Sequence, residues 1–287
     1  MLPLIFEDLG INRITLPDLP ERAQLMRRVD RKFSIGGEHL ELLFTLIAPH
    51  YSLVQAGDQD ASVYLNRYWD GVDRPFFHAH RVKKPRRYKF RQRTYAANGM
   101  SFWELKERQA TGYTRKMRLE AGPSPSDEDA QVALHHLWNR AGVDPPGGLQ
   151  PALDIHYKRL SFVNNNGHER LTLDYDLCLS EPINGQGGYA HRTSRPSSPT
   201  KRPTETEQEW LCSRDLYILE LKQDRPGPSI LDPLRRGGCL KAMSFSKYYI
   251  GSLLWQAHQT NHQTVRAIPT RLGYGRAWTM TPIRKPL

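Results

Sequence analysis

The sequences RYKFRQRTY (residues 87–95) and MSFWELKER (residues 100–108) decide how this chain folds. In both stretches charged residues alternate with apolar or aromatic ones, and a period of two is typical of a β-strand with one buried face. Between them, Asn98-Gly99 is a frequent turn of two-residue hairpins. The two stretches therefore predict an antiparallel hairpin that is ionic on one face and apolar on the other.

The same alternation continues along the chain. It predicts five further strands, at residues 62–69, 113–119, 156–163, 170–177 and 216–222. Helical periodicity covers residues 37–48, 126–141 and 245–258, and Ser126 and Gly142 are typical first and last signals of the second helix. Because strands and helices do not alternate, the pattern favours an antiparallel α+β fold over a doubly wound parallel sheet.

Composition narrows the class of protein. The chain has 287 residues, of which 38% are hydrophobic, and this is enough apolar material for a large core. The net charge of +11 predicts an anionic partner. Cys178, Cys212 and Cys239 lack the spacing of metal ligands, so we expect reduced thiols in a cytoplasmic protein. No apolar run reaches the roughly 18 residues of a transmembrane helix, so no membrane segment is expected.

Charged residues form rows along the predicted strands. The rows are Arg87, Lys89, Arg91 and Arg93; Glu104, Lys106 and Arg108; Lys116 and Arg118; Arg170, Asp174 and Asp176; and Glu220 and Lys222. One such row is the wet face of most antiparallel sheets. Several cationic rows together repel one another unless an anion neutralises them. A sheet closed into a barrel around these rows would form a basic tunnel that suits a polyanion such as triphosphate. The acids Glu104 and Glu220 then make sense as ligands of a divalent cation that bridges carboxylate and phosphate oxygens.

An ordered series of motifs resembles one known family. The series is DRKF (30–33), YWD (68–70), RYKFRQRTY (87–95), FWELK (102–106), YKR (157–159), RLTLDYD (170–176), LELK (219–222) and SFSKY (244–248). It resembles the VTC domain, the catalytic domain of the vacuolar transporter chaperone complex and of its bacterial relatives, over roughly residues 25–260. The resemblance implies the fold of the triphosphate tunnel metalloenzymes, an eight-stranded antiparallel β-barrel with helices outside.

The domain organisation follows from the extent of these motifs. We expect an N-terminal extension (1–24), the tunnel domain (25–268) and a C-terminal tail (269–287). Residues 182–206 are rich in Pro, Ser and Gly, and we interpret them as a mobile insertion within the domain.

The resemblance also implies an activity and a set of site residues. The family member of known activity makes polyphosphate from ATP, so a metal-dependent polyphosphate polymerase with Mn²⁺ or Mg²⁺ is implied, with ATP and polyphosphate as partners. Implied catalytic residues are Arg91, Arg93, Lys106 and Arg159. Implied phosphate or nucleotide ligands are Lys32, Lys89, Lys116, Arg170, Lys222, Ser246 and Lys247. Glu220 and Glu104 are the expected metal ligands.

Three other functions compete with a polymerase. A triphosphatase of the same fold would use the same residues, with water as the acceptor. A non-catalytic polyphosphate-binding module would keep the cations and lose turnover. A nucleic-acid surface fits less well, because it has no need of Glu104 and Glu220 in register with the cations, and no DNA or RNA partner is expected. A P-loop kinase is excluded, since the sequence has no G-x-x-x-x-G-K-[ST] motif. The oligomeric state stays open.

Overall fold

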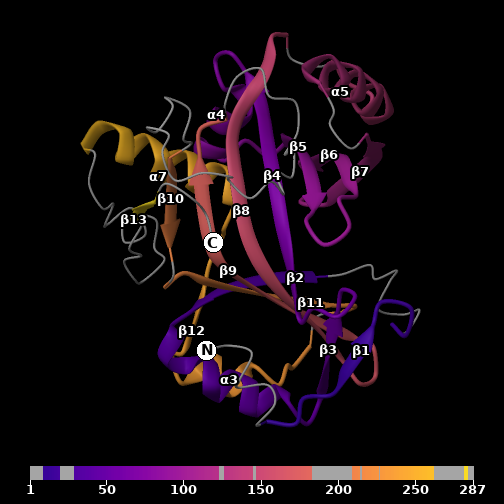
Figure 1. Cartoon of the computed structure of the whole chain (residues 1–287), viewed down its shortest axis with the longest axis vertical. Helices are drawn as coiled ribbons and strands as arrows, with labels where there is room; N and C mark the ends of the chain where they lie inside the picture. Colours follow the sequence, from indigo (N-terminus) through magenta and orange to yellow (C-terminus); the bar gives the residue numbers. More distant parts are fainter. Residues whose placement is uncertain are drawn as a thin grey trace, which may run out of the picture.

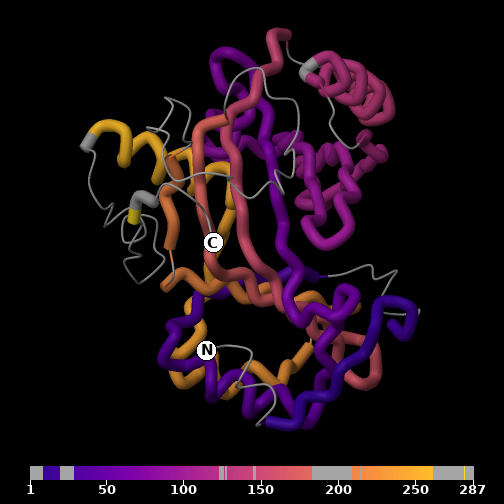
Figure 2. The backbone as a smooth tube through the Cα atoms, viewed as in Figure 1, coloured from indigo at the N-terminus to yellow at the C-terminus, as the bar shows by residue number. Residues whose placement is uncertain are grey.

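One large, mainly antiparallel sheet organises the protein (Figures 1 and 2). The structure is a computed structural model, and it describes residues 9–19, 29–122, 126–144, 147–182, 209–213, 215–225, 227–261 and 281–283. The strands are β1 (Arg13–Thr15), β2 (Val29–Ile35), β3 (Tyr51–Gln55), β4 (Ala61–Gly71), β5 (Arg87–Tyr95), β6 (Ser101–Arg108), β7 (Thr114–Ala121), β8 (Leu149–Asn164), β9 (Glu169–Ser180), β10 (Trp210–Ser213), β11 (Tyr217–Gln223), β12 (Leu240–Ala242) and β13 (Thr281–Ile283). The main path of hydrogen-bonded neighbours is β12-β2-β11-β9-β8-β4-β5-β6-β7.

The helices pack against this sheet at several places. They are α3 (Leu40–Ile47), preceded by the 3₁₀ turn η1 (Gly37–His39), α4 (Pro75–Arg81), α5 (Asp127–Ala141), α6 (Asp232–Arg236) and α7 (Lys247–Asn261). In Figure 1, α5 lies beside β6 and β7, and α3 lies at the opposite end of the molecule. The two largest apolar clusters among the described residues lie against the sheet: one joins α4, α5 and α7 to its middle, and a smaller one joins α3 to β2, β3 and β11.

All seven strands predicted from alternation are present, and the antiparallel α+β class is confirmed. The strand predicted at 87–95 has those bounds in the structure, whereas β8 begins seven residues before its predicted start at residue 156. Helix α5 has both predicted end signals: the Ser126 hydroxyl accepts a hydrogen bond from the Asp129 amide, and Gly142 ends the helix in the left-handed conformation at φ 69°. Local sequence thus specifies the longer elements, whereas the strands β1, β2, β3, β10, β12 and β13 and the helices α4 and α6 were not predicted.

The closed eight-stranded barrel that the resemblance implied is wrong for this chain. The path of paired strands ends at β12 on one side and at β7 on the other, and in the described ranges these two edges do not pair. Strand β12 has only three residues, and β7 carries Arg115, Lys116 and Arg118 along its length. A short edge and a positively charged edge both oppose further strand pairing, so the sheet stays open.

The open sheet is nevertheless curled around one face. We call the face that carries Asn66, Arg91, Glu104 and Glu220 the concave face; strand register places these residues on the same side. Helix α7 packs on part of this face. A Cβ atom at Gly251 would come within 2.9 Å of Leu153 and 3.1 Å of Leu179, so glycine is needed for this close approach. The helix thereby brings its first residues to the ionic part of the face.

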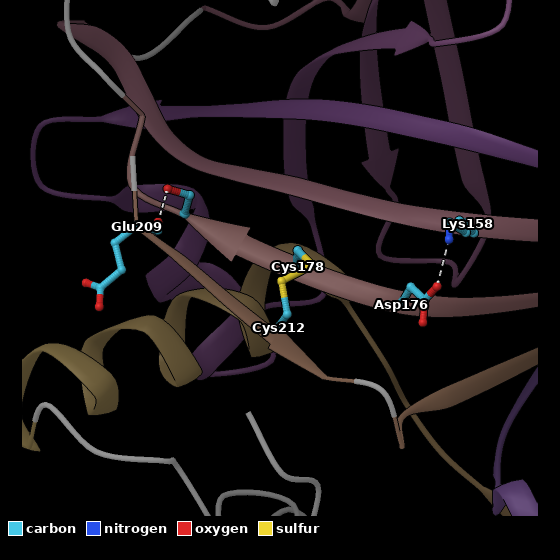
Figure 3. Close-up of a disulfide and its surroundings, with 6 residues drawn as sticks. Lys158, Asp176, Cys178, Glu209 and Cys212 are labelled. Carbon is cyan, nitrogen blue, oxygen red and sulfur yellow. Dashed lines mark hydrogen bonds and ion pairs between the residues drawn. A yellow bond between two sulfur atoms is a disulfide. The ribbon is translucent and has the colours of Figure 1, made fainter. Parts of the chain in front are cut away.

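The expectation of reduced thiols is wrong for two of the three cysteines. Cys178 on β9 and Cys212 on β10 are direct cross-strand partners with Cα atoms 4.1 Å apart, and they form a disulfide (Figure 3). The sequence places them 34 residues apart, and only the pairing of β9 with β10 brings them together. Cys239 is a free thiol.

The structure describes only part of the predicted N-terminal extension and C-terminal tail. Strand β1 belongs to the expected N-terminal extension, yet it pairs in parallel with β3 and is therefore part of the sheet. From the expected tail, β13 pairs with β10. The expected insertion lies, apart from Pro182, outside the described residues. In the described ranges, no helix combines the length and apolar character needed to cross a membrane.

Candidate functional site

Strand register brings the ionic rows together on the concave face. Arg91 lies between Tyr68 of β4 and Glu104 of β6, and Lys89 lies beside Lys106. The rows continue through Arg159 opposite Asp174, and through Glu220 opposite Lys32. The predicted separation into an ionic and an apolar face is therefore confirmed for these strands.

The carboxylate of Glu104 holds three cations. Arg91 donates to it at 2.5 Å and 2.9 Å, the Nζ atom of Lys116 lies 2.5 Å away, and the Nε atom of Arg93 lies 4.0 Å away. The side chain is 2% exposed, and burial by itself would raise its pKa. The charges of Arg91, Arg93 and Lys116 outweigh burial and hold the pKa of Glu104 well below its ordinary value. Glu104 is thus a charged anchor for the basic side chains.

Arg93 is held by groups that sequence reasoning did not identify. Its Nε atom donates to Asn66 at 3.0 Å, and its Nη2 atom donates to the Tyr157 hydroxyl at 2.9 Å. Its guanidinium lies 4.8 Å from the centre of the Tyr64 ring, a cation–π distance. Both Asn66 and Tyr157 are buried, so Arg93 has one defined position. Their place on the same face of β4 and β8 is the signal that could have found them.

Asp174 is a second anchor, also missed as a site residue. Arg159 donates to it through two nitrogens, at 2.5 Å and 2.8 Å, and Lys247 donates from the start of α7. Burial acts to raise the pKa of Asp174, but the charges of Arg159 and Lys247 lower it below its ordinary value. Asp174 stands opposite Arg159 in the strand register, and that pairing becomes visible only once β8 and β9 are aligned.

Glu220 is the third anchor. It accepts a hydrogen bond from Lys32, and the Nζ atom of Lys222 lies 3.7 Å away. Burial opposes its negative charge, yet Lys222, Lys32 and Arg159 keep its pKa well below the ordinary value. We call Glu104, Asp174 and Glu220 the anchor carboxylates. Each one holds at least two of the basic side chains that the family resemblance singled out.

The two halves of the curled sheet face each other across the concave face. Lys89 on β5 and Lys32 on β2 are separated by four strands along the sheet, yet Lys32 helps to lower the pKa of Lys89. Burial is the largest cause of that lowering, followed by the charge of Lys106. In the same way, burial and Lys32 lower the pKa of Lys106, while Glu220 acts against them. The face therefore surrounds a region of positive potential.

The remaining predicted residues lie at the border of this region. Arg170 pairs in register with Lys222 on the neighbouring strand. The Ser246 hydroxyl accepts a hydrogen bond from the Tyr249 amide at 3.3 Å, so this serine begins α7 as its N-cap. The next residue, Lys247, is bonded to Asp174. Strand register and ion pairs therefore bring the predicted strand residues and Lys247 to one face, and Ser246 precedes Lys247 at the start of α7.

The anchor carboxylates suit a metal ion only when phosphate oxygens of a bound substrate supply further ligands. No three His, Cys, Asp or Glu side chains gather into a metal-binding group in the part of the chain that the structure describes. The anchor carboxylates are ionised oxygen donors, but they sit in separate ion-pair groups. Such single carboxylates fit Mg²⁺ or Mn²⁺ that is shared with substrate phosphates, because these ions are often held by one or two carboxylates plus phosphate oxygens.

Comparison with known proteins gives one extensive match. The VTC domain family model matches residues 27–256. No curated protein matches the chain at a significant level.

Similar solved structures include a candidate adenylyl cyclase from Hippeastrum with a dominant triphosphatase activity, at 14% identity and a TM-score of 0.43, covering 78% of this chain and 94% of that one. They also include a protein from Pyrococcus horikoshii OT3, at 15% identity and a TM-score of 0.41, covering 81% and 99% of the two chains. At these TM-scores the structural resemblances carry no argument.

Proposed function

Since this chain belongs to the VTC domain family, we propose that its concave face binds ATP and transfers the terminal phosphoryl group to a growing polyphosphate chain. The proposal assigns it as a metal-dependent ATP–polyphosphate phosphotransferase. Its support is the chemistry of the concave face, taken together with the match to the family over residues 27–256.

One observation carries the proposal: cations outnumber the anchor carboxylates on a face where most of the charged side chains are partly buried. Seven Lys and Arg side chains lie within ion-pair distance of three anchor carboxylates. Lys89 and Lys106 add two more positive charges to the same face. Such an excess is costly in a partly buried site, and a ligand that carries several negative charges relieves it. Triphosphate is a compact ligand of that kind.

The arrangement suits phosphoryl transfer, which requires positioning and charge neutralisation more than covalent help from the protein. In the proposed complex Arg91, Arg93 and Arg159 bind the transferred phosphoryl group, because planar guanidinium groups bind phosphate with two parallel hydrogen bonds. The anchor carboxylates hold these side chains in place before the substrate arrives, so little reorganisation is needed during the reaction. Lys106, Lys116 and Arg170 then bind the acceptor chain.

A divalent metal fits this scheme through Glu220, with Glu104 as the second candidate ligand. Both carboxylates are ionised, and both lie on the face that would hold the phosphates. When bound, the ion would neutralise charge on the phosphate oxygens. Lys32 and Lys222, which now contact Glu220, would then be released to bind phosphate.

The test is to incubate the purified protein with ATP, Mn²⁺ and a trace of pyrophosphate. The length of the polyphosphate chains is then measured on a gel, together with the amount of free phosphate. Long chains that an exopolyphosphatase degrades, formed with an equal amount of ADP, would support the proposal. Phosphate release without chains would show that water is the acceptor and would replace the polymerase by a triphosphatase. Polyphosphate binding without either product would leave only a binding module.

A matched pair of variants ties the activity to the site. Arg93→Lys keeps the charge but loses the two hydrogen bonds to Asn66 and Tyr157. Arg140→Ala removes an exposed charge at the end of α5 and serves as the control. We expect turnover to fall strongly in the first variant and to stay unchanged in the second.

A further inference from the structure

The end of β4 carries a buried carboxylate that the proposed reaction does not use. Asp70 is fully buried, and four uncharged donors surround its two oxygens. The amides of Gly71, Phe76 and Phe77 donate at 2.8–2.9 Å, so Asp70 holds the turn between β4 and α4. The fourth donor is the hydroxyl of Tyr248 in α7, at 2.5 Å and 178 residues further along the chain. Asp70 is therefore a fixed point to which α7 is bonded.

Through this hydrogen bond, Tyr248 fixes the first turn of α7, which begins with Lys247. Lys247 donates to the anchor carboxylate Asp174, and its Nζ atom lies 4.5 Å from the centre of the Tyr157 ring. Successive side chains of an α-helix differ in direction by about 100°. Tyr248 therefore reaches the end of β4 while Lys247 reaches the ionic part of the concave face, and the position of one helical turn sets both.

The ring of Tyr248 supports a second site residue. It stacks on the ring of Tyr68, with centroids 5.1 Å apart and an angle of 18° between the planes. The Tyr68 hydroxyl in turn accepts a hydrogen bond from the Nη1 atom of Arg91 at 2.9 Å. Both tyrosines are buried, so neither ring can move without displacing the other. The position of Arg91 thus depends on the position of Tyr248.

Docking of α7 onto the sheet does not require the Tyr248 hydroxyl. Gly251 brings the helix close to Leu179, and the Tyr249 ring packs on Phe77 of α4 with centroids 5.4 Å apart. Apolar contacts are non-directional, so they hold the helix without fixing its rotation about its own axis. The hydrogen bond to the end of β4 is directional and fixes that rotation, independently of the ion pairs that a bound phosphate would displace.

We propose that Tyr248, held by Asp70, is a positioning residue for phosphoryl transfer, which sets the places of Lys247 and Arg91 relative to each other without touching the substrate. The inference rests on the proposed function, and it adds a residue that does not itself bind phosphate. Lys247 comes from α7 and Arg91 from β5, and Tyr248 connects the supports of both. Their relative position matters because a misplacement of about 1 Å can cost about 100-fold in rate.

The test compares Tyr248→Phe with the control Tyr249→Phe. The first variant keeps the ring that stacks on Tyr68 and removes the hydrogen bond to Asp70, which retains its three amide donors. The control removes the hydroxyl of the next residue of the same helix, which makes no hydrogen bond to any residue that the structure describes. Turnover is measured as ADP formed from ATP with Mn²⁺, so that the comparison holds whether water or polyphosphate is the acceptor. Thermal unfolding of each protein is measured in parallel.

We expect Tyr248→Phe to lower kcat roughly tenfold and to leave the KM for ATP within about twofold, because the other cations still bind the triphosphate while the reacting group is misaligned. Its melting temperature should fall by no more than about 4 °C, as for the loss of one hydrogen bond in a domain of this size. Tyr249→Phe should match the wild type in all three quantities. Tyr68→Phe, which removes the acceptor of Arg91, should lower kcat in the same way with little change in KM.

Three results would overturn the inference. An unchanged kcat in Tyr248→Phe or in Tyr68→Phe would show that the connection between the two rings does not act on the reaction. A rise in KM at constant kcat would place the Tyr248 hydroxyl in substrate binding. A large fall in melting temperature with a matching fall in kcat would make the hydrogen bond to Asp70 a purely structural one. Failure of the proposed function looks different, because the wild type itself would then form no ADP, and the inference would fall with it.

Discussion

Replacing Glu104 by Gln tests whether the anchor carboxylates are counter-charges that a polyanion displaces. The substitution keeps the shape of the side chain and removes its charge. It leaves Arg91, Arg93 and Lys116 together on a face where Glu104 is 2% exposed. Without a ligand, the three cations then have no neutralising partner at this position.

The magnitude follows from the burial of the group. Removing one partner of a buried ion pair typically costs about 3–5 kcal/mol of the free energy of unfolding. Lys116 is 45% exposed and is partly screened by water, so the lower end of that range applies. A loss of about 3 kcal/mol lowers the melting temperature of a domain of this size by roughly 6 °C or more.

The assay is thermal unfolding of both proteins, without and with tripolyphosphate and without metal. Because the variant has no carboxylate competing for the cations, it should bind the anion more tightly than the wild type does. In excess, a ligand stabilises each protein by RT ln(1 + [L]/Kd), so a variant that binds about tenfold more tightly gains about 1.4 kcal/mol more than the wild type does. The difference in melting temperature should therefore shrink by roughly half when tripolyphosphate is added. Glu120→Gln, an exposed acid on β7, is the control and should change neither value.

If the difference in melting temperature between Glu104→Gln and the wild type stays the same after tripolyphosphate is added, the counter-charge interpretation is refuted. A difference that grows only when Mn²⁺ accompanies the ligand would show that Glu104 is a metal ligand, as its sequence position first suggested. An unchanged melting temperature without ligand would mean that the three cations are stable without an anchor.

Further predictions concern the metal, pH, the disulfide and one tyrosine. Glu220→Gln should abolish the response of tripolyphosphate binding to Mn²⁺; an unchanged metal titration would contradict that role. Because the pKa values of the three anchor carboxylates are lowered on folding, their stabilisation is complete above the unfolded values near 4.5 and 3.8 and is lost as the pH falls further. The melting temperature should thus fall on acidification, less steeply in Glu104→Gln. Cys178→Ser removes the cross-link to Cys212, 34 residues away, and should lower the free energy of unfolding by roughly 3–4 kcal/mol relative to the oxidised wild type. Denaturant unfolding measures this loss, and the wild type with its disulfide reduced should show the same stability as the variant. Tyr157→Phe removes a hydrogen-bond acceptor of Arg93 and should lower turnover about tenfold with a small change in melting temperature. A fall in turnover that is accompanied by a large fall in melting temperature would indicate a structural role.

Much of the site could be predicted from sequence because strand periodicity is a local property. Alternation in residues 87–95 and 100–108 assigned each side chain to a face before any pairing was known, and the register of β5 with β6 agrees with it. The capping signals of α5 were equally local. Asp174 was visible in its row, but its role depends on Arg159 of another strand and Lys247 of α7, which no local pattern connects to it.

Sequence by itself determined seven of the strands, the helices α3, α5 and α7, the ionic face and the family motifs, because these follow from the order of neighbouring residues. Tertiary structure alone decided which cations each carboxylate holds, that Cys178 meets Cys212, and that the sheet curls without closing. Those features depend on contacts between strands far apart in the chain and on the twist accumulated across the sheet. Among the described residues the edges at the short β12 and the cationic β7 stay unpaired, although Lys106 on β6 and Lys32 on β2 are near enough for their charges to interact across the concave face.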